Sequence, residues 1–117
     1  MSKTIRLTGA TIDDGQSFLI DAETRQHLHL VGKKGAVSAK TTSLTAVVLY
    51  TDGTAITYDL KGCGPRGPVG EKRITNIAVK RINGNDNFLL ISFENGQPKL
   101  FNSWTRQHVG RVHILNF

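Results

Sequence analysis

The sequence predicts an all-β fold, a compact single domain of short antiparallel strands and hairpins with internal pseudo-repeats of about forty residues. Short runs rich in β-branched residues alternate with Asp-Gly and Asn-Gly turn pairs along the whole chain. No window sustains the i, i+3, i+4, i+7 apolar spacing of an amphipathic helix. The chain also repeats itself, because residues 14–27 and 95–108 align without a gap at an offset of 81, with seven of fourteen positions identical.

A third and shorter copy of this stretch lies at residues 52–59, so the turn pairs recur at positions 14, 52 and 95. Repeats of this length are usually architectural units that bury a face against their neighbours. We therefore divide the single domain, residues 1–117, into pseudo-repeats of about 1–36, 37–78 and 79–117. Three repeats of four short strands fit either a trefoil-like barrel or a set of propeller-blade-like β units.

The composition suits a soluble, cytoplasmic protein. A chain of 117 residues can bury a core without covalent staples. Its single cysteine, Cys63, excludes an internal disulfide framework, and its N-terminus lacks an apolar run of signal length. No stretch approaches the ~20 apolar residues of a membrane span, so we expect no membrane association.

Strand signals and turns alternate along the first repeat. Thr4 to Thr8 alternates apolar and polar residues, a turn follows at residues 13–15, and Phe18 to Ala22 forms the next strand. Residues 27–30 alternate again, and residues 33–35 form a loop.

The second repeat holds the strongest local signal. Leu44 to Tyr50 and Thr54 to Leu60 flank Asp52-Gly53, which favours a hairpin with a type I′ turn in which both central residues have positive φ. Residues 62–72 are rich in glycine and proline and predict a loop.

A strand at residues 73–82 leads into the third repeat, and a turn follows at residues 83–86. Phe88 to Phe93 is a nearly continuous apolar strand, and Asn95-Gly96 joins it to residues 99–102. The final predicted strand covers residues 109–115.

Residues 88–112 resemble strands of a WD-type propeller blade. The resemblance covers this repeat well and a second one in part. The chain departs from that family because it lacks the Gly-His start and the Trp-Asp end. The likeness therefore indicates four-stranded β units, and three such units could close a ring only by associating with another chain.

The first candidate site is the basic segment of residues 60–81, which carries most of the net charge of +6. Its cations surround a Gly/Pro loop with accessible backbone N–H groups, which suits an anionic partner. The alternative is a solvated loop that aids solubility. The predicted partner-binding residues are Lys61, Arg66, Lys72, Arg73, Lys80 and Arg81.

The two Thr-Arg-Gln-His tetrads are a second candidate. On a regular strand Arg25 and His27 would share a face, as would Arg106 and His108, and could bind carboxylate or phosphate. The alternative, which we favour, is a turn after each hairpin whose side chains cap backbone groups.

Metal, cofactor and catalytic signals are weak. No Cys-x-x-Cys or His-Glu-x-x-His spacing occurs, so no metal and no cofactor is expected. Cys63 could be reactive beside Lys61 and Arg66, although a plain thiol is commoner. Trp104 could stack on a base, whereas Tyr58 and Phe101 suit a core.

These patterns predict a non-enzymatic binding protein that engages an anionic partner through the basic Gly/Pro loop. The partner would be nucleic acid, a protein that handles nucleic acid, or an acidic protein surface. One alternative is a protein-interaction and assembly module that forms a homo-oligomer through β edges. Further alternatives are a small-ligand or carbohydrate-binding β-repeat module and a hydrolase.

Overall fold

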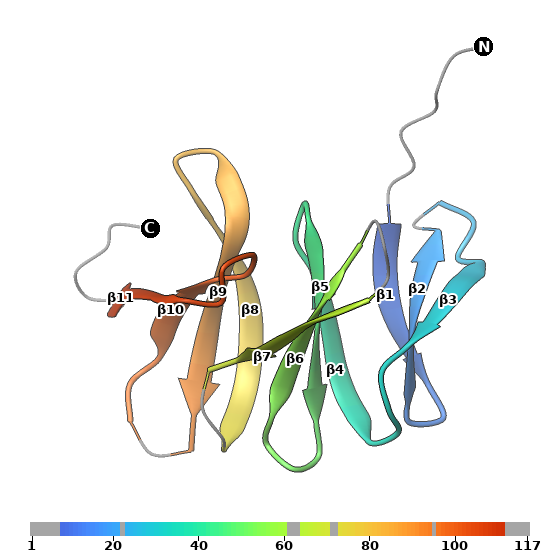
Figure 1. Cartoon of the computed structure of the whole chain (residues 1–117), viewed down its shortest axis with the longest axis horizontal. Coiled ribbons are helices and arrows are strands. Elements are labelled where there is room, and N and C mark those ends of the chain that lie inside the picture. Colours follow the sequence, from blue (N-terminus) through green and yellow to red (C-terminus); the bar gives the residue numbers. More distant parts are fainter. Residues whose placement is uncertain (1–7, 22, 61–63, 71–72, 95, 112–117) are drawn as a thin grey trace.

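The computed structural model describes residues 8–21, 23–60, 64–70, 73–94 and 96–111. Within these ranges the chain forms strands and turns and no helix, which confirms the predicted all-β class (Figure 1). The strands form three antiparallel sheets in chain order, here called sheets A, B and C. Sheet A contains β1 (Thr8–Asp13), β2 (Gln16–Asp21) and β3 (His27–Val31).

Sheets B and C have four strands each. Sheet B contains β4 (Ala36–Thr41), β5 (Thr45–Tyr50), β6 (Ala55–Asp59) and β7 (Pro65–Val69). Sheet C contains β8 (Ile74–Ile82), β9 (Asn85–Phe93), β10 (Lys99–Asn102) and β11 (His108–Arg111). In every sheet each strand pairs with the strand that follows it in the chain, so each sheet is a simple meander.

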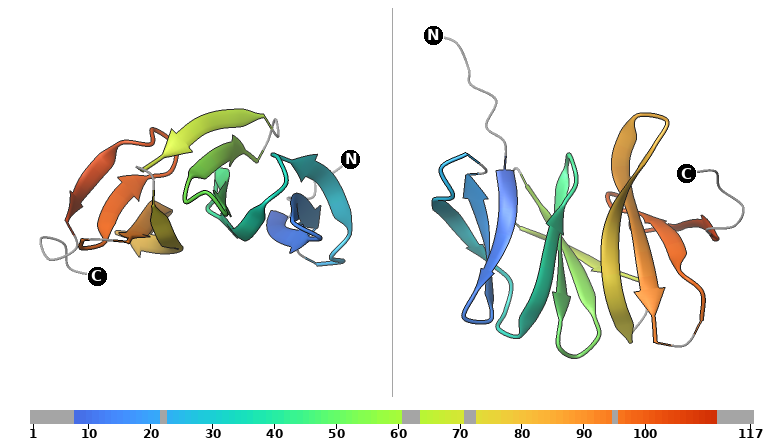
Figure 2. Two further views of the ribbon diagram at one scale, coloured as in Figure 1. Left: turned by 90° about the horizontal axis from the view of Figure 1, so that it is seen from below. Right: turned by 180° about the vertical axis from the view of Figure 1, so that it is seen from behind.

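The three sheets stand side by side in an arc with sheet B in the middle (Figures 1 and 2). Strands β4 and β8 lie on the concave side of this arc, and β7 lies on the convex side. Strand β4 contacts both β1 and β8, so the first strands of the sheets face one another. The described strands thus form three separate antiparallel units that follow one another along the chain.

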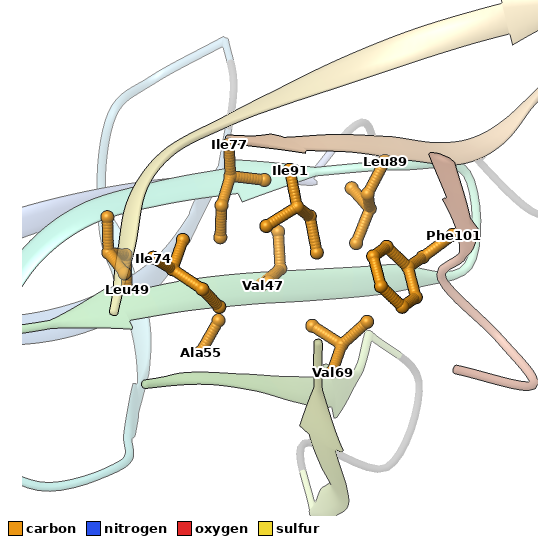
Figure 3. Packing of buried hydrophobic residues seen from close by; sticks show 9 residues of the cluster. All are labelled: Val47, Leu49, Ala55, Val69, Ile74, Ile77, Leu89, Ile91 and Phe101. Atoms are coloured by element: carbon orange, nitrogen blue, oxygen red, sulfur yellow. The ribbon is translucent and has the colours of Figure 1, made fainter. Parts of the chain in front are cut away.

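Two apolar cores fill the spaces between the sheets. The core between sheets A and B contains Leu19, Val31, Ala36, Ala46, Val48, Tyr50 and Tyr58. The core between sheets B and C contains Val47, Leu49, Ala55, Val69, Ile74, Ile77, Leu89, Ile91 and Phe101 (Figure 3). Side chains of β5 from Ala46 onward alternate between the two cores, which explains why that strand is buried along its whole length.

The turn chemistry differs from the sequence prediction in one hairpin. Gly53 has positive φ but Asp52 does not, and the Gly53 N–H donates to the Tyr50 carbonyl oxygen. The prediction of a type I′ turn at this site is therefore wrong. The loop is one residue longer than a two-residue turn, and it forms a type I turn followed by a glycine bulge. Both central residues have positive φ at Asp14-Gly15 and at Asn83-Gly84, where two-residue loops join the strands.

Three strand predictions also need correction. The loop expected at residues 62–72 contains strand β7, in which Pro65 and Pro68 are tolerated because β7 is an edge strand. Strand β4 was not predicted, because alanine, serine and lysine give it little β propensity. The first strand runs over residues 8–13, and most of the expected Thr4 to Thr8 strand lies outside the described residues.

The last two strands of each sheet share one irregularity. The register shifts between Leu19 and Ile20 in sheet A, between Thr57 and Tyr58 in sheet B, and between Leu100 and Phe101 in sheet C. Each shift leaves one extra residue on the outer strand, and these bulge residues are Leu28, Arg66 and Val109. The shared irregularity is consistent with the internal repeat in the sequence.

Ile20, Tyr58 and Phe101 are therefore equivalent in position, since each follows its register shift directly. They are 1%, 5% and 7% exposed, so all three positions are buried, as the sequence predicts for Tyr58 and Phe101.

Candidate functional site

The two Thr-Arg-Gln-His tetrads form matching turns after β2 and β10. The side-chain oxygen of Asp21 accepts hydrogen bonds from the backbone N–H groups of Glu23 and Thr24. Asn102 does the same for Trp104 and Thr105, at 2.8 and 3.0 Å. The hydroxyls of Thr24 and Thr105 then accept from the backbone two residues further on. These side chains cap backbone groups, as the sequence predicts for a turn after each hairpin.

The tetrad arginines lie in these turns. Arg25 and Arg106 have φ of 65° and 64°, and neither belongs to a strand. The expected arginine and histidine pairs on one strand face are therefore absent from both turns. His27 stacks instead on Phe18, with ring centroids 4.4 Å apart, and His108 lies 5.3 Å from the Phe101 ring.

Arg66, a predicted partner-binding residue, contacts the neighbouring sheet. Its guanidinium lies 3.5 Å from the centroid of the Trp104 ring. Its Nε and Nη2 donate to the Trp104 carbonyl oxygen at 3.3 and 3.0 Å. The arginine therefore joins strand β7 of sheet B to the β10–β11 turn of sheet C. It also lies over the ring of Trp104, the residue that the sequence suggests for stacking on a base.

The other predicted cations do not form one cluster in the described structure. Arg73 precedes β8 and Arg81 lies near its other end, which places their backbones about 26 Å apart in an extended strand. Both side chains are exposed, whereas Lys80 is half-buried. Lys61 and Lys72 lie outside the described residues, and so does Cys63.

The structure reveals a different surface at one end of the arc, which sequence reasoning missed. Leu19 points into the core between sheets A and B, so its neighbours Phe18 and Ile20 point away from sheet B. Leu30 pairs with Phe18 and therefore shares that face. We call Phe18, Ile20 and Leu30 the outer face of sheet A. Ile20 is buried, Phe18 is half-buried, and Leu30 is 51% exposed.

The opposite end of the arc carries a second apolar row. Leu89 and Phe101 point into the core between sheets B and C, so Leu90 and Leu100 point away from it. Ala78 pairs with Leu90 and extends the row across β8, β9 and β10. We call Ala78, Leu90 and Leu100 the outer face of sheet C. Leu100 is buried, and the other two are half-buried.

Exposed apolar side chains also lie on the edge strands of sheets A and C. Leu28, on the edge strand of sheet A, is 38% exposed, and Val109, on the edge strand of sheet C, is 47% exposed. The internal repeat could have indicated both outer faces, because their residues match the core positions of the other sheets.

Among the described residues, two side chains have a displaced pKa. Burial and the hydrogen bond with Tyr50 raise the pKa of Tyr58 well above its ordinary value. Hydrogen bonds from the Thr54 side chain and backbone, with a smaller contribution from Lys33, lower the pKa of Asp52. Both pKa shifts arise from contacts that support the fold, since Tyr58 lies in a core and Asp52 lies in a turn.

Within the described ranges, no three His, Cys, Asp or Glu side chains come together in a way that could hold a metal ion. The part of the chain that the structure describes also contains no helix with the length and apolar character that a membrane crossing requires. In comparisons with known proteins, no family model and no curated protein matches this chain.

Proposed function

We propose that this chain is a protein-interaction and assembly module that binds through the apolar ends of its sheet array. The observation that carries the proposal is the outer face of sheet A. Leu30 is 51% exposed there, beside the half-buried Phe18, on a sheet whose other face packs against sheet B. Apolar side chains that gather on one exposed face typically mark an interaction surface.

The edge of the same sheet supports this proposal. Strand β3 is the last strand of sheet A, and four of its five residues are exposed. An exposed edge strand offers unpaired backbone groups to a partner, and proteins usually protect such edges with charge or proline. Strand β3 has neither, since it reads His-Leu-His-Leu-Val.

Cross-linking from the outer face tests the proposal. A photoreactive residue replaces Leu30 in one variant and Val37 in a matched control, because Val37 is equally exposed but lies on sheet B. In cells that produce the chain, position 30 should give adducts of discrete mass and position 37 should not. The adducts should disappear when Thr11, which pairs with Phe18 on the same face, becomes Asp. Equal labelling at both positions, or no adduct at position 30, would overturn the proposal.

An anionic partner, such as nucleic acid or an acidic protein, has less support. Arg66 is occupied by Trp104, and the exposed cations of the described residues are nearly balanced by exposed carboxylates. The exposed cations are Arg25, Lys33, Lys34, Lys40, Arg73 and Arg81, and the exposed carboxylates are Asp13, Asp14, Glu23, Asp52 and Glu94. Mobility-shift binding with a steep salt dependence would favour this partner instead.

A further inference from the structure

We infer that the outer face of sheet A binds the outer face of sheet C of a second copy of this chain. This inference rests on the proposed function and names its partner. The chain already contains two interfaces between sheets, one between sheets A and B and one between sheets B and C. Both use the residues directly before and directly after the register shift of a sheet, and the inference extends this rule to the two outer faces.

The residue after the register shift points toward the preceding sheet. Tyr58 of sheet B belongs to the core shared with sheet A, and Phe101 of sheet C belongs to the core shared with sheet B. Ile20 holds this position in sheet A, where no described sheet precedes it. The outer face of sheet A is therefore equivalent to the faces with which sheets B and C pack against the sheet before them.

The residue before the register shift points toward the following sheet. Leu19 of sheet A shows this, since it belongs to the core shared with sheet B. Leu100 holds this position in sheet C, where no described sheet follows it, and Leu90 lies across from it. The outer face of sheet C is therefore the other half of the same kind of interface.

The bulge residues of sheets B and C also support an interface with a following sheet. Arg66 of sheet B reaches forward to the β10–β11 turn of sheet C. Val109 holds the equivalent position in sheet C and is 47% exposed. A following sheet from a second copy would cover Val109, Leu90 and Ala78 together.

Such a contact is heterologous, because it joins two different surfaces. The arc of the three sheets curves in one direction, so sheets added at either end continue that curve (Figure 2). Two copies that exchange both contacts would form a ring of six sheets, and propellers close with about four to eight blades.

Sedimentation of purified chain tests the inference with three variants. Leu30→Asp introduces a charge on the outer face of sheet A, Val109→Asp does so beside the outer face of sheet C, and Val37→Asp is the control at a third exposed site. The wild-type chain and the control should shift from monomer to dimer as the protein concentration increases. Each of the other two variants should weaken that association by about tenfold or more.

Mixing the two weakened variants identifies the pairing. A mixed pair retains one intact contact between an unaltered A face and an unaltered C face, so the mixture should associate more strongly than either variant alone. Sensitivity to Leu30→Asp alone would indicate an A-to-A contact and overturn the inference. A wild-type chain that stays monomeric would overturn it as well. In the cross-linking experiment, adducts at a mass other than twice that of the chain would contradict a second copy while leaving the proposed function intact.

Discussion

The guanidinium of Arg66 lies over the ring of Trp104 and donates two hydrogen bonds to the carbonyl oxygen of the same residue. The two residues are 38 positions apart in the chain and belong to different sheets. A cation that the sequence assigns to a partner therefore holds two parts of this molecule together.

Replacement of Arg66 by lysine should destabilise the fold. Lysine lacks the planar fork that both stacks on the ring and donates twice to one oxygen. We expect the free energy of unfolding to fall by about 1–2 kcal/mol in a denaturant titration. Arg81→Lys is the matched control, since Arg81 is exposed, and it should change stability by no more than about 0.5 kcal/mol. Equal stability of the two variants would show that the Arg66 contact contributes nothing to the fold.

Glycine substitutions at two turns should separate backbone strain from steric conflict. Gly53 and Gly84 have φ of +80° and +79°, so alanine is strained at both, by about 1–2 kcal/mol. A Cβ at position 53 would also lie 2.9 Å from the Arg73 nitrogen, whereas nothing lies within 4 Å at position 84. Gly53→Ala should therefore lower the melting temperature more than Gly84→Ala, and the reverse order would contradict the close approach of the two loops.

The capping side chains of the two tetrad turns should matter more than the tetrad arginines. Asp21→Ala and Asn102→Ala each leave two backbone N–H groups without their side-chain acceptor, which should cost about 1 kcal/mol of stability. Asp21→Asn retains an acceptor oxygen and should remain close to wild type. Arg25→Gly should have little effect or stabilise the chain, because Arg25 has positive φ. Thermal unfolding of the four variants measures this order, and a larger loss for Arg25→Gly than for Asp21→Ala would contradict it.

The sequence was most informative where a local rule decides the structure. Asp-Gly and Asn-Gly pairs marked hairpins, and Tyr58 and Phe101, which the sequence assigns to a core, are buried. Local rules failed for β7, because glycine and proline indicate a loop unless the segment is known to lie at a sheet edge.

The candidate surfaces depend on contacts between sheets. The pairing of Arg66 with Trp104 follows from how sheets B and C stack, which no local pattern in the sequence specifies. The residues of the outer faces match core positions of the other sheets, so the internal repeat could indicate them. Which faces have no described neighbouring sheet depends on how the sheets stack.

The buried phenol pair of Tyr50 and Tyr58 should make stability fall in alkaline solution. Their oxygens lie 2.6 Å apart, and burial together with this bond raises the pKa of Tyr58. Above the ordinary tyrosine pKa of about 10, the unfolded chain loses the Tyr58 proton while the folded chain keeps it. The unfolded state then binds fewer protons, so the free energy of unfolding decreases as the pH rises, by up to about 1.4 kcal/mol per pH unit.

Tyr58→Phe should remove this part of the pH dependence. At neutral pH the variant should lose about 1 kcal/mol, because the buried Tyr50 hydroxyl no longer has the Tyr58 oxygen as a partner. Above pH ~10 its stability should decrease less steeply than that of the wild-type chain, since residue 58 no longer titrates. Lysine titration affects both chains equally, so it cancels in the difference between the two denaturant-unfolding curves at each pH, which reports on the Tyr50–Tyr58 pair. Parallel curves from neutral pH to above pH ~10 would show that the folded chain does not hold this proton more tightly than the unfolded chain.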